Sequence, residues 1–295
     1  MAGAALIGPT LLAAASGLLA GAFYGLIASG FALVLGVTRV FNLAHGELLV
    51  VGAYLAERAW TWGHIHPLLA LPFAALFVGV LAAASERVLR RVPPGPDLEL
   101  RVLILTFGGS LLIQSLLQAA FASDYRLISV PGWDRAIGPP LLRVPAGRVV
   151  AGVAGLAILL ALHVLLSRTT FGKALRAVSA DREAASMMGV DPAWADRWAL
   201  ALGGALAGAA GTMFAALHYI TPTKGIDATL TALILTILGG VGQMLGLLAA
   251  GLAFGLAEAL AVAWLGAQWR EAFALAVLLG LLGWRGQGLA AGRRY

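Results

Sequence analysis

Residues 1–38, MAGAALIGPTLLAAASGLLAGAFYGLIASGFALVLGVT, contain no Asp, Glu, Lys or Arg. A helix needs about 20 apolar residues to cross the hydrocarbon core of a bilayer, and this stretch exceeds that length. Further runs without a charged residue follow at 59–85, 102–123, 149–167, 198–223 and 228–257. In lipid the backbone must satisfy its own hydrogen bonds, which long runs of Leu, Ala, Gly and Val do as helices. A membrane barrel would instead show alternating segments of about ten residues.

The composition of the whole chain agrees with helices in a membrane. Of its 295 residues, 60% are hydrophobic and only 12% are charged. Soluble domains carry about twice that share of charge, which excludes an ordinary soluble globular protein and a disordered chain. We predict a single all-α domain over residues 1–295, a polytopic membrane protein with about eight or nine transmembrane helices. The predicted spans are 9–37, 42–62, 67–88, 101–121, 148–166, 198–220, 227–241, 245–265 and 269–286.

Several kinds of chemistry are excluded by what the chain lacks. It has no cysteine, which rules out disulfides, thiolate catalysis and cysteine-ligated metals. The segment Phe171-Gly172-Lys173-Ala174 lacks the upstream glycine and the hydroxyl residue of a nucleotide-binding loop. We therefore expect no metal and no cofactor in this chain, and any ATP must be bound by another subunit.

The orientation in the membrane follows from the Lys and Arg residues, which accumulate in cytoplasmic loops. One side carries thirteen of the twenty: Arg39, Arg87, Arg90, Arg91, Arg101, Arg168, Lys173, Arg176, Arg182, Arg197, Arg285, Arg293 and Arg294. The other side carries seven: Arg58, Arg126, Arg135, Arg143, Arg148, Lys224 and Arg270. This bias predicts that the 167–197 loop and the C-terminus are cytoplasmic and that the N-terminus lies outside.

Glycines recur at four-residue spacing within the apolar runs. The examples are Gly17, Gly21 and Gly25, then Gly204 and Gly208, and finally Gly251 and Gly255. Such spacing lets helices approach closely in lipid. We interpret these glycines as helix-packing positions.

The 167–197 loop is the longest one on the predicted cytoplasmic side. Its residues 181–188 read as a short helix, which Asp181 can cap and Gly189 can end. Asp191 and Pro192 then begin the next helix as its cap and first residue. A helix this short is not stable alone in water, so its side chains need a partner surface: either another protein or the lipid interface.

Polar residues inside the apolar runs form a second set of candidates. The segment Arg39-Val40-Phe41-Asn42-Leu43-Ala44-His45-Gly46-Glu47 joins two spans, and the spacing of Asn42 and His45 would place both on one helix face. Isolated polar groups also occur at Gln114, Gln118, Gln243 and Glu258. Such groups in a membrane either pair between helices or line a path. We take Asn42, His45, Glu47, Gln114, Gln243 and Glu258 as a candidate translocation pathway.

These residues resemble a known family. Glu183-Ala184-Ala185, with Gly189 four residues later, is similar to the E-A-A-x-x-x-G loop of bacterial ABC importer permeases. The segment Asn42-Leu43-Ala44-His45-Gly46-Glu47, followed by Gly52-Ala53-Tyr54, resembles branched-chain amino acid permeases of the LivH type. The resemblance continues in order through Thr106-Phe107-Gly108, residues 171–177 and 238–242, and Ala257-Glu258-Ala259.

The resemblance implies a permease subunit of an ATP-driven importer in the bacterial inner membrane, which moves amino acids by alternating access. It implies four kinds of contact: a second homologous permease, two ATP-binding cassette subunits, a periplasmic substrate-binding protein and membrane lipid, with no nucleic acid. The residues expected to couple to the ATPases are Glu183, Ala184, Ala185, Met187, Met188 and Gly189.

Three alternatives remain open from the sequence. Urea and short-chain amide importers look very similar, so the substrate class is less specific than the transporter class. An intramembrane enzyme could use His45 and Glu47, although two residues at that spacing diverge on a helix. A passive channel would need no coupling helix.

Overall fold

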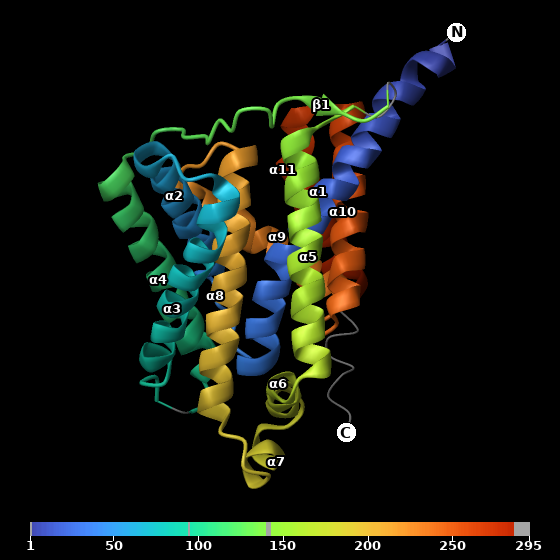
Figure 1. The fold of residues 1–295 in the computed structure, drawn as a ribbon. Coiled ribbons are helices and arrows are strands. Elements are labelled where there is room, and N and C mark those ends of the chain that lie inside the picture. Colours follow the sequence, from blue (N-terminus) through green and yellow to red (C-terminus); the bar gives the residue numbers. More distant parts are fainter. Residues whose placement is uncertain (1, 94, 140–142, 286–295) are drawn as a thin grey trace.

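The computed structural model describes residues 2–93, 95–139 and 143–285, and it shows one bundle of helices (Figure 1). Within these residues the helices are α1 (Ala2–Thr38), α2 (His45–Gly63), α3 (Pro67–Leu89), α4 (Leu98–Phe121), α5 (Ala146–Arg168), α6 (Thr170–Ala180), α7 (Arg182–Met187), α8 (Pro192–Leu217), α9 (Gly225–Gly239), α10 (Met244–Leu265) and α11 (Arg270–Arg285). The all-α prediction is confirmed.

Short elements mark one end of the bundle. Strands β1 (Ala136–Ile137) and β2 (Val144–Pro145) form an antiparallel hairpin near the beginning of α1 (Figure 1). The 3-10 helix η2 (Ala267–Trp269) precedes α11 at the same end, which we call the hairpin end. The opposite end carries α6 and α7 and is called the α7 end. The 3-10 helix η1 (Pro222–Lys224) precedes α9 and lies inside the bundle, because Gly225, which follows it, packs against Glu47 of α2.

Six of the described helices are long and apolar enough to cross a membrane: α1, α3, α4, α5, α8 and α10. The shorter helices do not meet that condition, because α9 has 15 residues and α11 has 16, while α2 carries Glu47, Glu57 and Arg58 within its 19 residues. The chain is therefore a polytopic membrane protein with six clear spans, and the total of eight or nine stays a prediction.

The centre of the bundle is built from α1 and α8. The most apolar windows of these two helices are 72% and 67% buried, whereas those of α3, α4, α5 and α10 lie between 22% and 33%. Because lipid is as apolar as a side chain, the outward faces of these outer helices can stay hydrophobic. The central helices thus have neighbours on nearly all sides.

The glycine positions explain how the helices approach one another. A Cβ atom on Gly21 of α1 would overlap the carbonyl of Gly251 on α10, and one on Gly204 of α8 would overlap Ala82 on α3. The prediction that the spaced glycines serve helix packing is confirmed, because side chains there would force the backbones apart.

Two segments differ from the sequence prediction. The second span begins at His45 and not at residue 42, so Asn42 lies in the turn between α1 and α2. The 167–197 segment is also more ordered than a loop, because α6 fills residues 170–180 and α8 begins at Pro192. The predicted cytoplasmic tail after residue 285, with Arg293 and Arg294, lies outside the described residues.

Candidate functional site

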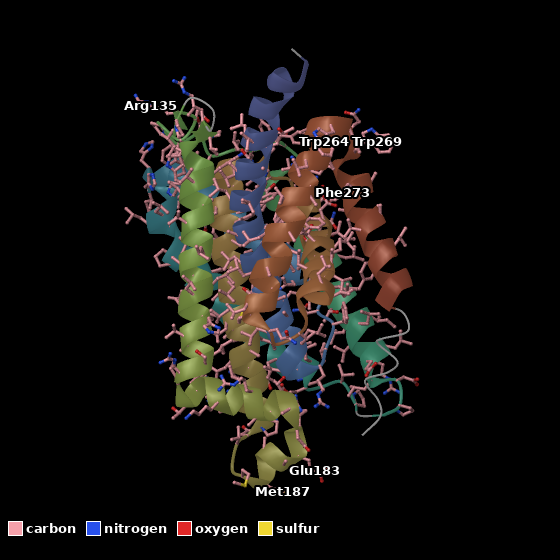
Figure 2. All side chains as sticks on the ribbon, turned by 90° about the vertical axis from the view of Figure 1, so that its right-hand side faces the viewer. Arg135, Glu183, Met187, Trp264, Trp269 and Phe273 are labelled. Carbon is pink, nitrogen blue, oxygen red and sulfur yellow. The ribbon has the colours of Figure 1, made fainter. Side chains whose placement is uncertain are left out.

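Helix α7 forms a separate projection at the α7 end of the bundle (Figure 1). In Figure 2, Glu183 and Met187 lie at the tip of this projection, away from the membrane helices. The hairpin end, with Trp264 and Trp269, lies at the opposite extreme of the molecule. The E-A-A segment is therefore presented outside the bundle, where another molecule can reach it.

The ends of α7 are fixed by the residues that the sequence indicates. The Asp181 carboxylate accepts hydrogen bonds from the backbone N–H groups of Glu183 at 2.9 Å and Ala184 at 3.0 Å. These bonds satisfy two of the donors that a helix N-terminus leaves unpaired. Gly189 has a φ of 86°, a conformation that costs a residue with a side chain about 1 kcal/mol or more. Asp191 caps α8 in the same way, at 2.9 Å from the N–H of Ala193.

The side chains of α7 divide into an outward set and one inward residue. Met187 and Met188 are 78% and 84% exposed, and Glu183 and Ala184 are exposed as well. Ala185 is buried, because it packs into a cluster that includes Leu175 and Ala195. The expectation that Ala185 faces a partner is wrong, since the helix needs one small residue to lie against its own chain.

An ion pair that the sequence analysis missed holds α7 in place. Arg182 donates to both carboxylate oxygens of Asp196 on α8, at 2.9 and 2.6 Å, and to the carbonyl of Val37 on α1 at 3.0 Å. The hydrogen bonds to Asp196 raise the pKa of Arg182 above its usual value. A bidentate pair of this kind is strong and directional. Helix α7 is therefore tied to the two central helices of the bundle.

The neighbouring helix α6 is tied to α1 as well. The Ser179 hydroxyl donates to the Gly36 carbonyl at 2.7 Å, and Arg39 donates to the carbonyls of Ser179 and Ala180 at 3.3 and 3.1 Å. At the other end of α6, the Thr169 hydroxyl caps the helix by accepting a hydrogen bond from the N–H of Gly172 at 3.1 Å. The last turn of α1 is thus joined to both short helices.

The turn between α1 and α2 contains the N-L-A-H-G-E motif. The Asn42 side chain accepts a hydrogen bond from the Ala44 N–H at 3.0 Å, and its carbonyl accepts one from the His45 N–H at 3.2 Å. Asn42 therefore shapes the turn by bonding to its own backbone, which is a common role of Asn. The prediction that Asn42 and His45 share a helix face is wrong because the helix begins only at His45.

His45 and Glu47 point into different surroundings. His45 is 1% exposed and packs edge-on against Phe31 of α1, with ring centroids 5.5 Å apart. Glu47 is also 1% exposed; its carboxylate accepts from Ser110 of α4 at 3.3 Å and lies directly against Gly225, the first residue of α9. The two side chains therefore do not form a joint acid–base pair.

Hydroxyl groups on neighbouring helices complete this junction. Thr229 of α9 accepts from the Gly46 N–H at 2.9 Å, and Thr106 of α4 accepts from the Leu43 N–H at 3.3 Å. Sequence reasoning missed both threonines, because a single Thr in an apolar run carries no pattern. Their contacts show that the motif is a packed junction of α1, α2, α4 and α9.

The two glutamines of the candidate pathway lie on α4 and in the turn between α9 and α10. Gln114 is half-buried on α4, and its side chain makes no hydrogen bond to the described residues. Gln243 is exposed in the turn between α9 and α10 at the α7 end. Among the described residues, neither glutamine forms a hydrogen bond with His45 or Glu47, although Gln114 lies one helical turn from Ser110, which contacts Glu47.

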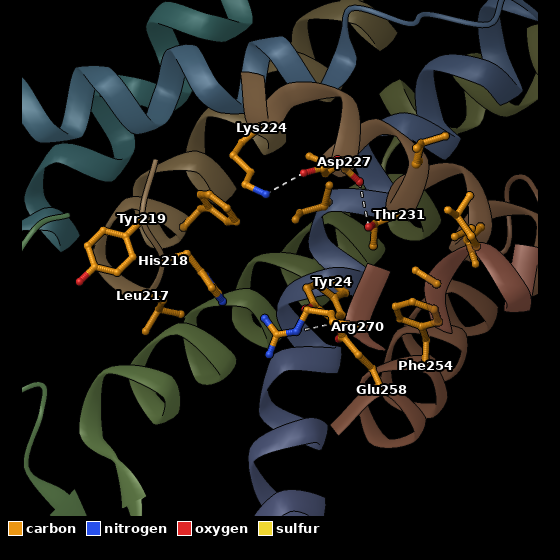
Figure 3. Close-up of a pocket in the computed structure, with 17 residues that line it drawn as sticks. Tyr24, Leu217, His218, Tyr219, Lys224, Asp227, Thr231, Phe254, Glu258 and Arg270 are labelled. Atoms are coloured by element: carbon orange, nitrogen blue, oxygen red, sulfur yellow. Dashed lines mark hydrogen bonds and ion pairs between the residues drawn. The ribbon is translucent and has the colours of Figure 1, made fainter. Parts of the chain in front are cut away.

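Glu258 occupies a third position, on α10 toward the hairpin end. Its side chain is 10% exposed, and its Oε1 lies 3.3 Å from Nε of Arg270, the first residue of α11. Figure 3 shows this ion pair, and the Tyr24 side chain on α1 also interacts with the carboxylate. Of the two roles predicted for Glu258, pairing between helices or lining a path, the structure shows the pairing. The pair also lines a cavity of about 460 Å³, and a place in the translocation pathway stays a prediction.

The described residues contain no group of three His, Cys, Asp or Glu side chains that could hold a metal ion. The structure offers helix packing, a projecting capped helix and a cavity with charged groups. A polytopic all-α membrane protein is the class that these features define.

The comparisons identify the family. Residues 13–282 match the family described as the branched-chain amino acid transport system / permease component, and the chain belongs to it. It is 28% identical to the high-affinity branched-chain amino acid transport system permease protein LivH of Escherichia coli (strain K12), with 90% of each chain covered. It is 27% identical to the permease protein BraD of Pseudomonas aeruginosa, with 93% of each covered, and 27% identical to a probable LivH of Methanocaldococcus jannaschii, with 84% and 80% covered.

No solved structure matches the chain significantly. The family confirms the resemblance that the sequence motifs indicate, and it makes the chain a transport component and not an enzyme. The alternative of an intramembrane enzyme using His45 and Glu47 is therefore wrong.

Proposed function

We propose that this chain is one of two homologous permease subunits of an ATP-driven importer of branched-chain amino acids. Its partners would be two ATP-binding cassette subunits, which bind the ATP, and a periplasmic protein that delivers the substrate. The chain itself would hold no cofactor. Support for the substrate comes from the names of the relatives, which are branched-chain amino acid permeases. The chain matches them over 90% and 93% of their length.

The observation that carries the proposal is the geometry of α7. It is a six-residue helix, capped at both ends and presenting Met187 and Met188 almost fully to the outside. Exposed methionines adapt well to a partner surface, and a helix of this length gains stability from packing against one. In the proposal, α7 lies on an ATPase subunit, with Glu183 available to a basic group of that partner.

The anchor of α7 suggests how motion would pass into the membrane. Arg182 joins α7 to both α1 and α8, which are the two most buried of the long helices. A displacement of α7 by the ATPases would therefore pull on the centre of the bundle and not on a peripheral helix. In the proposal this displacement drives alternating access.

The proposed orientation places the α7 end in the cytoplasm and the N-terminus outside, in the bacterial inner membrane. Three of the basic residues from the richer side, Arg39, Arg176 and Arg182, belong to the α7 end. The beginning of α1 lies at the hairpin end (Figure 1). A periplasmic binding protein would then dock at the hairpin end.

The test combines partner binding with transport. The tagged chain is purified from membranes together with its bound subunits, and the assembly is placed in proteoliposomes to measure leucine uptake, with valine and urea as competitors. We expect ATPase subunits to co-purify, and valine but not urea to compete. Competition by urea alone would favour the importer of short amides.

Two variants test α7 itself. Gly189→Val strains the turn that ends α7 by about 1 kcal/mol or more, and Met187→Glu removes an apolar contact; both should reduce ATPase co-purification and uptake. Gly242→Val is the matched control, since Gly242 has a φ of 80° and equally open space but lies between α9 and α10. If both α7 variants retain the ATPases and normal transport, α7 is not the coupling element.

A further inference from the structure

The cavity beside Glu258 lies between α1, α9, α10 and α11 and the segment after α8, and it has a volume of about 460 Å³. Figure 3 shows the side chains of these elements converging on it. Pockets that bind small molecules commonly measure about 300–1,000 Å³. The cavity therefore has the size of a small-molecule site.

One wall of the cavity carries two opposite charges. Glu258 and Arg270 meet at 3.3 Å through Nε of Arg270, and the Nη nitrogens of Arg270 make no hydrogen bond to the described residues. The Glu258 side chain is 10% exposed, whereas that of Arg270 is 49% exposed. A guanidinium with free nitrogens and a carboxylate beside it are thus available from the cavity.

The rest of the wall is largely apolar, although the ion pair of Lys224 and Asp227 lines it as well. Ile27 of α1, Ile234 of α9 and Phe254 of α10 supply apolar side chains. Ile234 and Phe254 are 1% and 4% exposed, so these side chains are held firmly by the bundle. The cavity therefore joins an anion-binding group, a cation-binding group and an apolar surface within one small volume.

We propose that this cavity is a substrate-binding site within the membrane for a zwitterionic amino acid with an aliphatic side chain. The Arg270 guanidinium would bind the carboxylate of the substrate, Glu258 would bind its ammonium group, and the apolar wall would hold its side chain. This proposal rests on the proposed function and names the residues that recognise the substrate.

The chemistry of the pair explains why both charges of the ligand are needed. A charge within a membrane protein is costly unless it is paired, and here each of the two charges neutralises the other. A zwitterion can replace that pairing by offering each group an opposite charge. A ligand with only an ammonium group, or only a carboxylate, would leave one group of the protein unpaired, so it should bind much more weakly.

The test uses cysteines placed in a chain that has none. Thr231→Cys introduces a thiol at the cavity wall, and Ser123→Cys introduces one on the exposed surface after α4. The rate of modification by a charged methanethiosulfonate reagent is measured in the assembled transporter in proteoliposomes, without the binding protein. Leucine should slow modification at Thr231→Cys in a saturable manner and leave Ser123→Cys unaffected.

The analogues and the charge variants define the recognition. Isoamylamine lacks the carboxylate of leucine and 4-methylpentanoate lacks its ammonium group, and neither should protect at the concentrations where leucine does. Glu258→Gln and Arg270→Gln should each raise the half-protecting concentration of leucine about ten- to a hundredfold, which is the effect of losing one charge-assisted hydrogen bond. The control is Glu86→Gln, which removes a buried carboxylate paired with Arg90 and Arg197 far from the cavity; it should leave protection unchanged.

Three results would overturn the proposal: no protection by leucine, equal protection by the two analogues, or full protection in both charge variants. Ala228→Cys is a second lining position in case Thr231→Cys fails to insert. Leucine uptake by the unmodified assembly is measured in parallel. Normal uptake without protection refutes this site alone, whereas absence of leucine uptake refutes the proposed function.

Discussion

Replacing Arg182 tests how the projecting helix is held. In the structure Arg182 makes two hydrogen bonds to Asp196, of 2.9 and 2.6 Å, and a third of 3.0 Å to the carbonyl of Val37. Arg182→Met keeps most of the length of the side chain and removes all three. We expect α7 to be held less firmly against α8 and α1, because these three hydrogen bonds are lost and only the packing of Ala185 remains.

The size of the effect follows from the exposure of the pair. Hydrogen bonds to charged groups contribute about 1.5–3 kcal/mol each, but exposed ion pairs contribute about 1 kcal/mol or less. The side chains of Arg182 and Asp196 are 33% and 20% exposed. The contribution of each contact should therefore lie between these two energies. A loss of about 3 kcal/mol for the three contacts together would lower the equilibrium constant for docking of α7 about a hundredfold.

The assay measures ATPase co-purification and leucine uptake for Arg182→Met, Arg182→Lys and the unchanged chain. We expect Arg182→Met to lose both and Arg182→Lys to be intermediate, because Lys keeps the charge but cannot form a bidentate pair. Lys173→Met is the control, since it removes a positive charge from an exposed position on the adjacent helix α6. Arg182→Met with normal uptake and normal amounts of bound ATPase would refute this account of the anchor.

Three further predictions concern packing, burial and topology. Gly21→Ala should lower the thermal stability of the purified chain by the equivalent of about 1–3 kcal/mol, because its Cβ would overlap α10. Gly108→Ala is the control and should leave the stability unchanged, since nothing lies within 4 Å of its Cβ position. Equal melting temperatures of the two variants would contradict the close crossing of α1 and α10. Glu47→Leu should reduce the yield of folded protein more than Glu47→Gln, since the amide retains an acceptor for the serine on α4, and equal yields would contradict that role. Ser186→Cys on α7 should resist an impermeant thiol reagent in intact cells while Ser123→Cys is modified; the reverse pattern would invert the proposed orientation.

The parts of the fold that sequence predicts well are those fixed by neighbouring residues. Asp181, Gly189 and Asp191 have the predicted capping and turn roles, because a cap depends only on atoms within about three positions. The glycine spacing is equally informative, because a helix crossing requires small residues on one face of each helix. The residues next to α7 are therefore enough to predict where this helix begins and ends.

The missed features depend on contacts between distant parts of the chain. The hydrogen bond between Arg182 and Val37 joins residues that are 145 positions apart. Neither segment contains a sequence pattern that predicts this contact. Ala185 faces inward for the same reason, since only the position of α6 and α8 decides which side of α7 is covered. The sequence indicates that Glu258 pairs between helices or lines a path, but its pairing with Arg270 depends on the turn after α10, which places α11 beside it.

The two candidate sites are connected by the same helices. Helix α1 is continuous from Tyr24, which contacts Glu258 beside the cavity, to Val37, which accepts the hydrogen bond from Arg182; these residues are about 20 Å apart along a helix that rises about 1.5 Å per residue. Helix α8 likewise joins Asp196 to Phe214 at the cavity wall. In the proposed importer, ATPase motion at α7 would therefore reach the substrate cavity through two rigid helices. Because Tyr24 interacts with Glu258, a shift of α1 would alter the charged pair that we propose binds the substrate. Alternating access requires such a difference in contacts between two states.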